Sequence, residues 1–280
     1  MKKIMLTSRI FDTRREALDY AQKNNYYGVE WYLNKFRLKI NLEKQKEFFI
    51  EMNKCPDLHF AFHLPTADIE IGHANLFYSE TSLKYLIMYI DFLKPWLIKQ
   101  QYRPIFIMHI GANSIPMEKL NWEITKENLK KLGKYIFEAN GCLCLENLKM
   151  GWTAEPKKLL DLVKYAGINI TFDSGHAASS PLILERKLTI REYINQLKTF
   201  IRYIHLYSYE TLDTGRHMPP KTWKEIKNVW EIIKSLSEVQ GVTIELTTLP
   251  ELEDTYNLLK RYNNLQLLNG FDLLNLNNGS

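Results

Sequence analysis

The feature of this sequence that most limits its fold is a regular alternation of short strand-like runs with helical segments. Each run is rich in β-branched and aromatic residues. Eight such runs occur in the chain, at Lys3–Ser8, Gly28–Tyr32, His59–His63, Ile105–His109, Cys142–Glu146, Asn169–Asp173, Arg202–His205 and Gly241–Glu245. The ends of successive runs lie between 22 residues (Ser8 to Glu30) and 46 residues (His63 to His109) apart, which is enough for one helix and its loops.

The segments between the runs carry helix signals. The pattern at Thr13–Glu16 is that of a capping box, and further helices are expected at Thr125–Phe137 and Lys221–Val239. Alternating strands and helices form a parallel sheet. No Gly-rich phosphate turn follows the first strand, as it would in a doubly wound dinucleotide-binding sheet. The sequence therefore predicts an α/β fold consisting of a single (β/α)8 TIM barrel.

Length and composition favour one domain of an ordinary globular protein. The chain has 280 residues, and its 12 glycines and 10 prolines are scattered, so no linker divides it. We expect the barrel to span residues 1–268 and a C-terminal tail to span residues 269–280.

The same composition argues against several classes of protein. The formal net charge of +5 is too small, and too evenly spread, to indicate a nucleic-acid binder. Three cysteines do not form a disulfide framework, and no apolar segment has the length of a secretory leader or a membrane span. We therefore expect a cytoplasmic protein without nucleic-acid or membrane partners.

Ionisable side chains gather at the ends of the strand-like runs. Six of them finish a run and two follow one closely: His63, His109, Glu146, Asp173, His205, Glu245, His176 and His217. The carboxyl ends of the strands of a parallel barrel lie on one face, where the loops form active sites. Side chains alternate along a strand, so Glu146 faces the barrel interior while Leu143 and Leu145 face the helices. Several carboxylates buried together cost stability unless a cation is present, which predicts a divalent-metal site.

Each candidate also has a structural explanation when taken alone. A single strand-end histidine is more often a hydrogen-bonded structural residue, and a single glutamate often forms a salt bridge or caps a helix. We interpret Cys142 and Cys144 as core residues, and His59 and His73 as surface or loop residues. Trp31 is either a wall against which a sugar stacks or a packing residue.

Six strand-end motifs resemble, in chain order, those of the xylose isomerase-like barrel superfamily. They are Phe60–Pro65 (FAFHLP), Ile107–Gly111 (IMHIG), Cys144–Asn147 (CLEN), Thr171–His176 (TFDSGH), Tyr203–Leu206 (YIHL) and Val242–Glu245 (VTIE). The superfamily includes sugar phosphate isomerases and epimerases and the endonuclease IV type of AP endonuclease. The six motifs together are specific for the superfamily and not for a substrate.

The epimerase branch of the superfamily implies a role for each candidate. One divalent metal ion (Mn, Mg, Co or Zn) would be held by Glu146, Asp173, His205 and Glu245. Glu146 and Glu245 would also be the catalytic acid/base pair, moving a proton of a sugar or sugar phosphate through a metal-stabilised enediolate. The resemblance implies that His176 contacts a substrate oxygen. From their own positions in the sequence, we also expect His63, His109, Arg216, His217 and Trp31 to contact the substrate. Lys149 lacks the spacing from Glu146 that hydride-shift isomerases have, so proton transfer is favoured.

Two other functions stay open. The endonuclease branch binds three zinc ions, and His63 and His109 match two of its ligands. Its Asp-x-His pair has no match, because Gly215 stands two residues before His217 and Asp213 is displaced by two positions. A zinc phosphodiesterase or AP endonuclease is therefore the first alternative, and a non-catalytic ligand-binding barrel is the second. In each case a homo-oligomer is possible.

Overall fold

The computed structural model describes residues 3–34, 42–111, 115–211 and 213–276. Eight parallel strands in these ranges form a closed barrel in the cyclic order β1-β2-β3-β4-β5-β6-β7-β10. Their bounds are β1 (Ile4–Thr7), β2 (Gly28–Tyr32), β3 (His59–His63), β4 (Ile105–Met108), β5 (Cys142–Glu146), β6 (Asn169–Asp173), β7 (Ile201–Leu206) and β10 (Gly241–Ile244). The predicted (β/α)8 barrel is confirmed, and each strand-like run overlaps one barrel strand.

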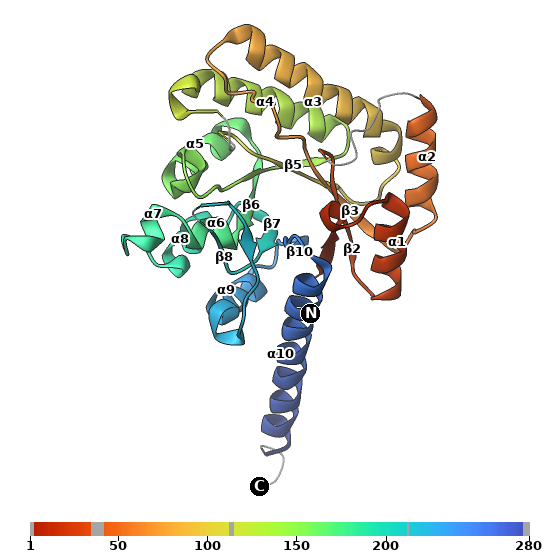
Figure 1. Cartoon of the computed structure of the whole chain (residues 1–280), viewed down its shortest axis with the longest axis vertical. Helices are drawn as coiled ribbons and strands as arrows, with labels where there is room; N and C mark the ends of the chain where they lie inside the picture. The colour runs from red at the N-terminus through yellow and green to blue at the C-terminus, as the bar shows by residue number, and fades with distance from the viewer. Residues whose placement is uncertain (1–2, 35–41, 112–114, 212, 277–280) are drawn as a thin grey trace.

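Helices connect the strands and surround the barrel (Figure 1). They are α1 (Arg14–Lys23), α2 (Leu42–Asn53), α3 (Leu76–Leu97), α4 (Trp122–Glu138), α5 (Pro156–Ala166), α6 (Ser174–Ala178), α7 (Pro181–Leu184), α8 (Ile190–Leu197), α9 (Trp223–Ser235) and α10 (Leu249–Leu276). Thr13 caps α1 through the predicted capping box with Glu16. No helix in the described ranges is both long and apolar enough to cross a membrane.

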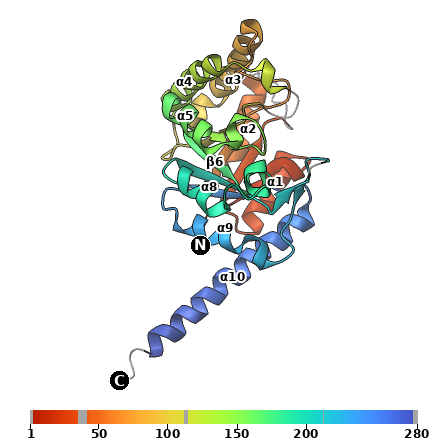
Figure 2. The same ribbon diagram turned by 90° about the vertical axis from the view of Figure 1, so that its left-hand side faces the viewer.

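Three elements differ from the sequence-based expectations. Helix α9 ends at Ser235 and not at Val239, because the chain turns extended at Leu236. A two-stranded antiparallel hairpin, β8 (Tyr209–Glu210) with β9 (His217–Met218), follows β7 and was not anticipated. Helix α10 crosses the expected boundary at residue 269, since its leucine-rich sequence favours a helix. Figures 1 and 2 show α10 extending away from the barrel.

Alternation of side chains along the strands divides the core into two layers. Leu143 and Leu145 of β5 belong to the large cluster between strands and helices, whereas Cys144 belongs to a small cluster inside the barrel. The partly buried Cys142 packs against that inner cluster, so the interpretation of both cysteines as core residues is confirmed. The same alternation turns the next side chain of β5, that of Glu146, into the barrel at its carboxyl end.

Candidate metal centre

The four side chains predicted to bind a metal meet at the carboxyl end of the barrel. Glu146, Asp173 and His205 lie on β5, β6 and β7, and Glu245 follows β10 directly. All four are buried, and each offers one ligand atom within 4.8 Å of those of the others. The His205 Nδ1 atom lies 3.1 Å from Glu146 Oε1, 3.2 Å from Glu245 Oε2 and 3.8 Å from Asp173 Oδ2.

One atom of this cluster shows that the residues fit a cation. Asp173 Oδ1 accepts a hydrogen bond of 2.7 Å from the His176 backbone N–H, but Asp173 Oδ2 is buried and has no hydrogen-bond donor within the described ranges. A buried carboxylate oxygen without a donor is costly unless a cation neutralises it. Three carboxylates and one imidazole also form a donor set that suits Mn, Co or Zn.

A second group of potential ligands adjoins the first and shares Glu146 with it. His63, His109 and Glu146 also place their ligand atoms within 4.8 Å of one another. Glu146 Oε2 lies 3.0 Å from His109 Nε2 and 3.8 Å from His63 Nε2. The sequence predicted one ion and left open whether these two histidines contact the substrate or further metal ions. The described side chains form two adjacent ligand groups that share Glu146, so they could hold a second cation.

The orientation of His63 suits a ligand. Its Nδ1 lies 3.0 Å from the Leu64 carbonyl oxygen, an acceptor, so Nδ1 carries the hydrogen and Nε2 presents its lone pair toward Glu146. Burial, together with the neighbouring His109, lowers the pKa of His63 to about 4. The ring is therefore neutral at neutral pH, which is the form that binds a metal.

Glu30 is a part of the site to which the sequence analysis gave no role. It is buried on β2, and its Oε2 accepts a hydrogen bond of 3.0 Å from His205 Nε2. This contact directs His205 Nδ1 at the three carboxylates, as the outer partners of metal-binding histidines commonly do. The sequence contained a signal for this role. Glu30 is an acidic residue near the end of the second strand-like run, as Glu146 is at the end of the fifth run.

The charges of the cluster depend on one another. Burial would raise the pKa of Glu146, but His205 and His109 outweigh it and hold that pKa well below its usual range. Burial would lower the pKa of His205, but Glu146, Glu30 and Glu245 raise it well above its usual value. Burial, reinforced by the two neighbouring glutamates, raises the pKa of Asp173 well above its ordinary range. The raised pKa values of Asp173 and His205 mean that, when no metal is bound, protons on these two groups balance the negative charge of the glutamates.

His176 and His217 lie beside the cluster as predicted, each held by a further partner. His176 Nε2 is 3.8 Å from Glu146 Oε1, and its Nδ1 is 2.8 Å from Glu210 Oε2. Glu210 in turn pairs with Lys149 at 2.8 Å, and these contacts hold the pKa of Glu210 at about 2 against the effect of burial. His217 Nδ1 donates to the Glu245 carbonyl oxygen at 2.8 Å. Glu210 and His217 face each other across the unanticipated β8–β9 hairpin, so sequence spacing gave no sign of Glu210.

Gly175 is required by the close packing around this hairpin. A Cβ atom at position 175 would lie 1.9 Å from Cε2 of Tyr207. The Tyr207 ring stacks on the His217 ring, with centroids 4.0 Å apart and planes 5° apart. The glycine in the sequence Asp173-Ser-Gly-His176 therefore lets the His176 turn approach the Tyr207–His217 stack.

The structure corrects three of the sequence-based interpretations. Trp31 is fully buried and packs against Phe48 and Phe60 on the helix side of β2, because it lies one residue after the inward-facing Glu30. It is a packing residue and not a sugar wall. Arg216 is half exposed, pairs with Glu251, and does not line the cavity described below. His59 is not a loop residue but the first residue of β3.

A cavity of about 760 Å³ lies beside the cluster, and His176 is part of its lining. The charged and polar residues that line it are Arg9, Lys149, His176, Glu210, Asp213 and Thr214. Arg9 reaches to within 3.7 Å of Glu245 Oε1. This volume is within the range of small-molecule sites, which is roughly 300–1,000 Å³.

The fold and the strand-end cluster place this chain among (β/α)8 barrels with a metal-binding composition at the carboxyl face. Its structural neighbours narrow the description. They include a D-tagatose 3-epimerase-like protein (TM-score 0.72, 17% identity, 96% of this chain and 99% of that one). A xylose isomerase domain protein from Planctomyces limnophilus has a TM-score of 0.62 and 14% sequence identity, over 95% of this chain and 96% of that one. D-psicose 3-epimerase with D-tagatose from Clostridium cellulolyticum H10 has a TM-score of 0.63 and 13% sequence identity, over 90% of this chain and 89% of that one. The chain has the xylose isomerase-like TIM-barrel fold.

Similarity in sequence is more limited. No family model matches the chain. The uncharacterized protein MJ0008 of Methanocaldococcus jannaschii is 29% identical over 145 residues, which is 51% of this chain. The match spans 60% of the length of that relative.

The unpaired oxygen of Asp173 leads to a prediction about stability. In the metal-free protein at neutral pH, Asp173→Asn is expected to raise the free energy of unfolding by about 1–3 kcal/mol, because the amide is neutral without the proton that the buried Asp173, with its raised pKa, must take up on folding. Saturating Mn²⁺ should stabilise the original protein but not the variant. Urea denaturation with EDTA or with Mn²⁺ measures both effects, and the exposed Asp161→Asn is the control. A metal-free variant less stable than the original would contradict the assignment.

The raised pKa of His176 predicts a pH dependence of stability. Burial opposes protonation, but Asp173 and the hydrogen bond that His176 donates to Glu210 raise the pKa of His176 to about 9 in the metal-free protein. A histidine with a raised folded-state pKa stabilises the fold fully below its unfolded pKa near 6.5, and this contribution disappears as the pH rises through about 9. The contribution is roughly 3 kcal/mol. Unfolding curves from pH 6 to 10 should show this decline, and a His176→Gln variant with the same decline would refute it.

Proposed function

We propose that this protein is a divalent-metal-dependent isomerase or epimerase that moves a proton on a sugar or sugar phosphate. The observation that carries the proposal is the pairing of Glu146 and Glu245, two buried carboxylates with ligand atoms within 4.8 Å. Their neighbours His176 and Arg9 line a cavity that is large enough for a sugar. Two carboxylates beside one reacting carbon are the arrangement needed to remove a proton and to return one.

The roles of the side chains follow from their charges and contacts. A divalent cation held by Glu146, Asp173, His205 and Glu245 would polarise the carbonyl group of a ketose and make the adjacent C–H more acidic. The surrounding histidines lower the pKa of both Glu146 and Glu245, which keeps the two carboxylates ionised and able to accept a proton. His176 would donate a hydrogen bond to a substrate hydroxyl through Nε2, since Glu210 holds its Nδ1.

The neighbouring structures support the choice of substrate class. Two of them are a D-tagatose 3-epimerase-like protein and a D-psicose 3-epimerase with D-tagatose. The expected substrates of this chain are therefore small ketoses or their phosphates, without a nucleic-acid or membrane partner. A cytoplasmic location and a homo-oligomer stay predictions.

A second candidate function is a metal-dependent phosphodiesterase, including an AP endonuclease. The observation that favours it is the group of His63, His109 and Glu146 next to the first ligand group. Two cations about 3.5–4 Å apart can hold the attacking and leaving oxygens of a phosphodiester. Asp213, the residue that a third site would need, is solvent-exposed and lies on the rim of the cavity.

One set of assays separates these functions. The purified chain, loaded in turn with Mn²⁺, Co²⁺, Mg²⁺ and Zn²⁺, is incubated with ketoses, inososes, their phosphates and a duplex containing one abasic site. An isomerase gives a new sugar and a solvent-derived hydrogen, with no strand cleavage. Zinc-dependent cleavage of the duplex without sugar turnover would replace the proposal with the phosphodiesterase. Ligand binding without turnover of any substrate would leave a non-catalytic barrel.

A further inference from the structure

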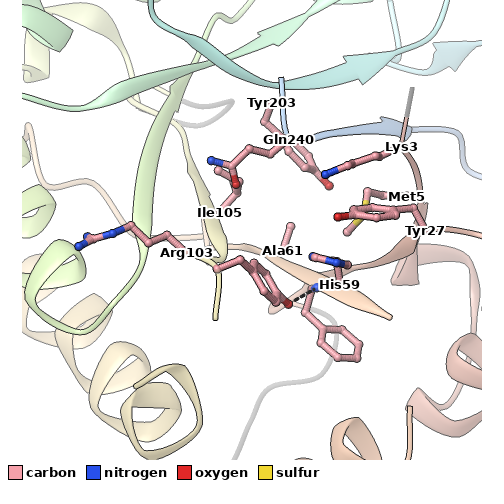
Figure 3. Close-up of a pocket in the computed structure, with 11 residues that line it drawn as sticks. Lys3, Met5, Tyr27, His59, Ala61, Arg103, Ile105, Tyr203 and Gln240 are labelled. Carbon is pink, nitrogen blue, oxygen red and sulfur yellow. Dashed lines mark hydrogen bonds between the residues drawn. The ribbon is translucent and has the colours of Figure 1, made fainter. Parts of the chain in front are cut away.

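A second pocket lies at the opposite end of the barrel from the metal centre. Its lining residues stand where strands begin: Lys3 and Tyr27 directly precede β1 and β2, His59 and Ile105 open β3 and β4, and Gln240 directly precedes β10. The cavity has a volume of about 370 Å³, which is sufficient for a small organic molecule. Figure 3 shows this pocket and the side chains around it.

An apolar layer separates this pocket from the metal centre. The interior cluster consists of Met5, Ala61, Ile105, Ile107, Cys144 and Tyr203. Four of these six residues also line the pocket, so they form its floor: Met5, Ala61, Ile105 and Tyr203. A molecule bound here would not touch Glu146 or Glu245, and the pocket is therefore a site of its own.

One wall of the pocket consists of aromatic rings. The rings of Tyr27 and His59 are stacked, with centroids 4.1 Å apart and planes 17° apart. The ring of Tyr102 lies next to His59, at 4.3 Å between centroids. Such a wall favours a flat ring, which can pack against it in an offset or edge-on arrangement.

The polar groups of the pocket are suited to an anion. Lys3 Nζ lies 4.8 Å from the centroid of Tyr27, and no carboxylate within the described ranges forms an ion pair with it. None of the described residues that line the pocket is acidic. The hydroxyl group of Tyr102 accepts a hydrogen bond from Phe60 N–H at 2.8 Å, which leaves its own hydrogen available to a ligand. The guanidinium of Arg103 points away from the pocket (Figure 3). It lies over the ring of Phe137, 3.7 Å from the ring centroid.

We propose that this pocket binds a small planar aromatic anion, such as an aromatic carboxylate. The ring of the ligand packs against the wall formed by Tyr27, His59 and Tyr102, and its charged group meets Lys3 at the rim. The metal centre plays no part in this binding, so the proposal is independent of the proposed enzymatic function.

The test is calorimetric titration of the whole chain with 2-naphthoate. Two analogues isolate the two requirements: 2-naphthalenemethanol has the ring without the charge, and cyclohexanecarboxylate has the charge without the planar ring. Binding of 2-naphthoate is expected to be the tightest of the three. Binding of all three with equal affinity, or no binding of 2-naphthoate, would overturn the proposal.

Variants then locate the bound molecule. Lys3→Met keeps the aliphatic stem and is expected to weaken 2-naphthoate binding about 10- to 100-fold, because it removes a charge-assisted contact. Lys3 is exposed, so the variant should fold, and the equally exposed Lys99→Met is the matched control with unchanged binding. Glu146→Gln should also bind normally. Unchanged affinity in Lys3→Met, or lost affinity in a folded Glu146→Gln protein, would place the probe elsewhere and refute the proposal.

Discussion

Replacing Glu146 by Gln is expected to abolish tight binding of divalent cations, with a loss of affinity for Mn²⁺ of more than about 100-fold. Glu146 belongs to both ligand groups, and its two oxygens face different partners: Oε1 lies 3.1 Å from His205 and Oε2 lies 3.0 Å from His109. A neutral amide weakens both groups at once. Isothermal titration calorimetry of the metal-free protein measures the change.

The stoichiometry of the same titration distinguishes one ion from two. If both groups are occupied, the original protein binds two equivalents of Mn²⁺ or Zn²⁺, and His109→Gln binds one. The exposed Glu138→Gln is the control for a general effect of charge, and it should bind as the original does. An unchanged affinity in a folded Glu146→Gln protein would show that the shared carboxylate is not a ligand.

Replacing Glu245 by Gln is expected to suppress proton exchange on the substrate by about 10²- to 10⁴-fold, the usual contribution of a general acid or base. The amide retains an oxygen that can still face the cation, so the variant should lose more in turnover than in metal affinity. The measurement is proton NMR of a ketose substrate incubated with the protein in D2O at saturating metal. Exchange converts one C–H group to C–D, so its proton signal disappears.

A residue outside the cavity lining supplies the control for that experiment. Glu251 pairs with the half-exposed Arg216 and is not part of the cavity lining, so Glu251→Gln should exchange as fast as the original protein. Full exchange in Glu245→Gln would reject its role as acid or base, while the metal assignment could still stand on the titrations.

Local sequence patterns predicted the parts of the site that depend on one strand. The alternation of Glu146 with its neighbouring leucines predicted which face of β5 points into the barrel, and the observed core layers confirm that orientation. The same alternation turns Trp31 toward the helices and brings Glu30 into contact with His205 of the metal centre. Of the two interpretations of Trp31, the packing residue is the one that the structure supports, because the side chain lies on the helix side of β2.

Features that depend on distances between strands could not be derived in this way. A list of strand ends does not show that His63 and His109 both approach Glu146, since the stagger of β3, β4 and β5 decides which side chains meet. Glu210 reaches His176 only because a short hairpin folds back over the mouth of the barrel. Such contacts require the three-dimensional arrangement of the loops.

Anomalous X-ray diffraction from crystals of the protein grown with Mn²⁺ tests the central claim most directly. We predict a strong anomalous peak within about 2.0–2.5 Å of carboxylate oxygens of Glu146, Asp173 and Glu245 and of Nδ1 of His205. A fully occupied manganese peak bound at any other place in the chain, with these four side chains free of metal, would contradict the account.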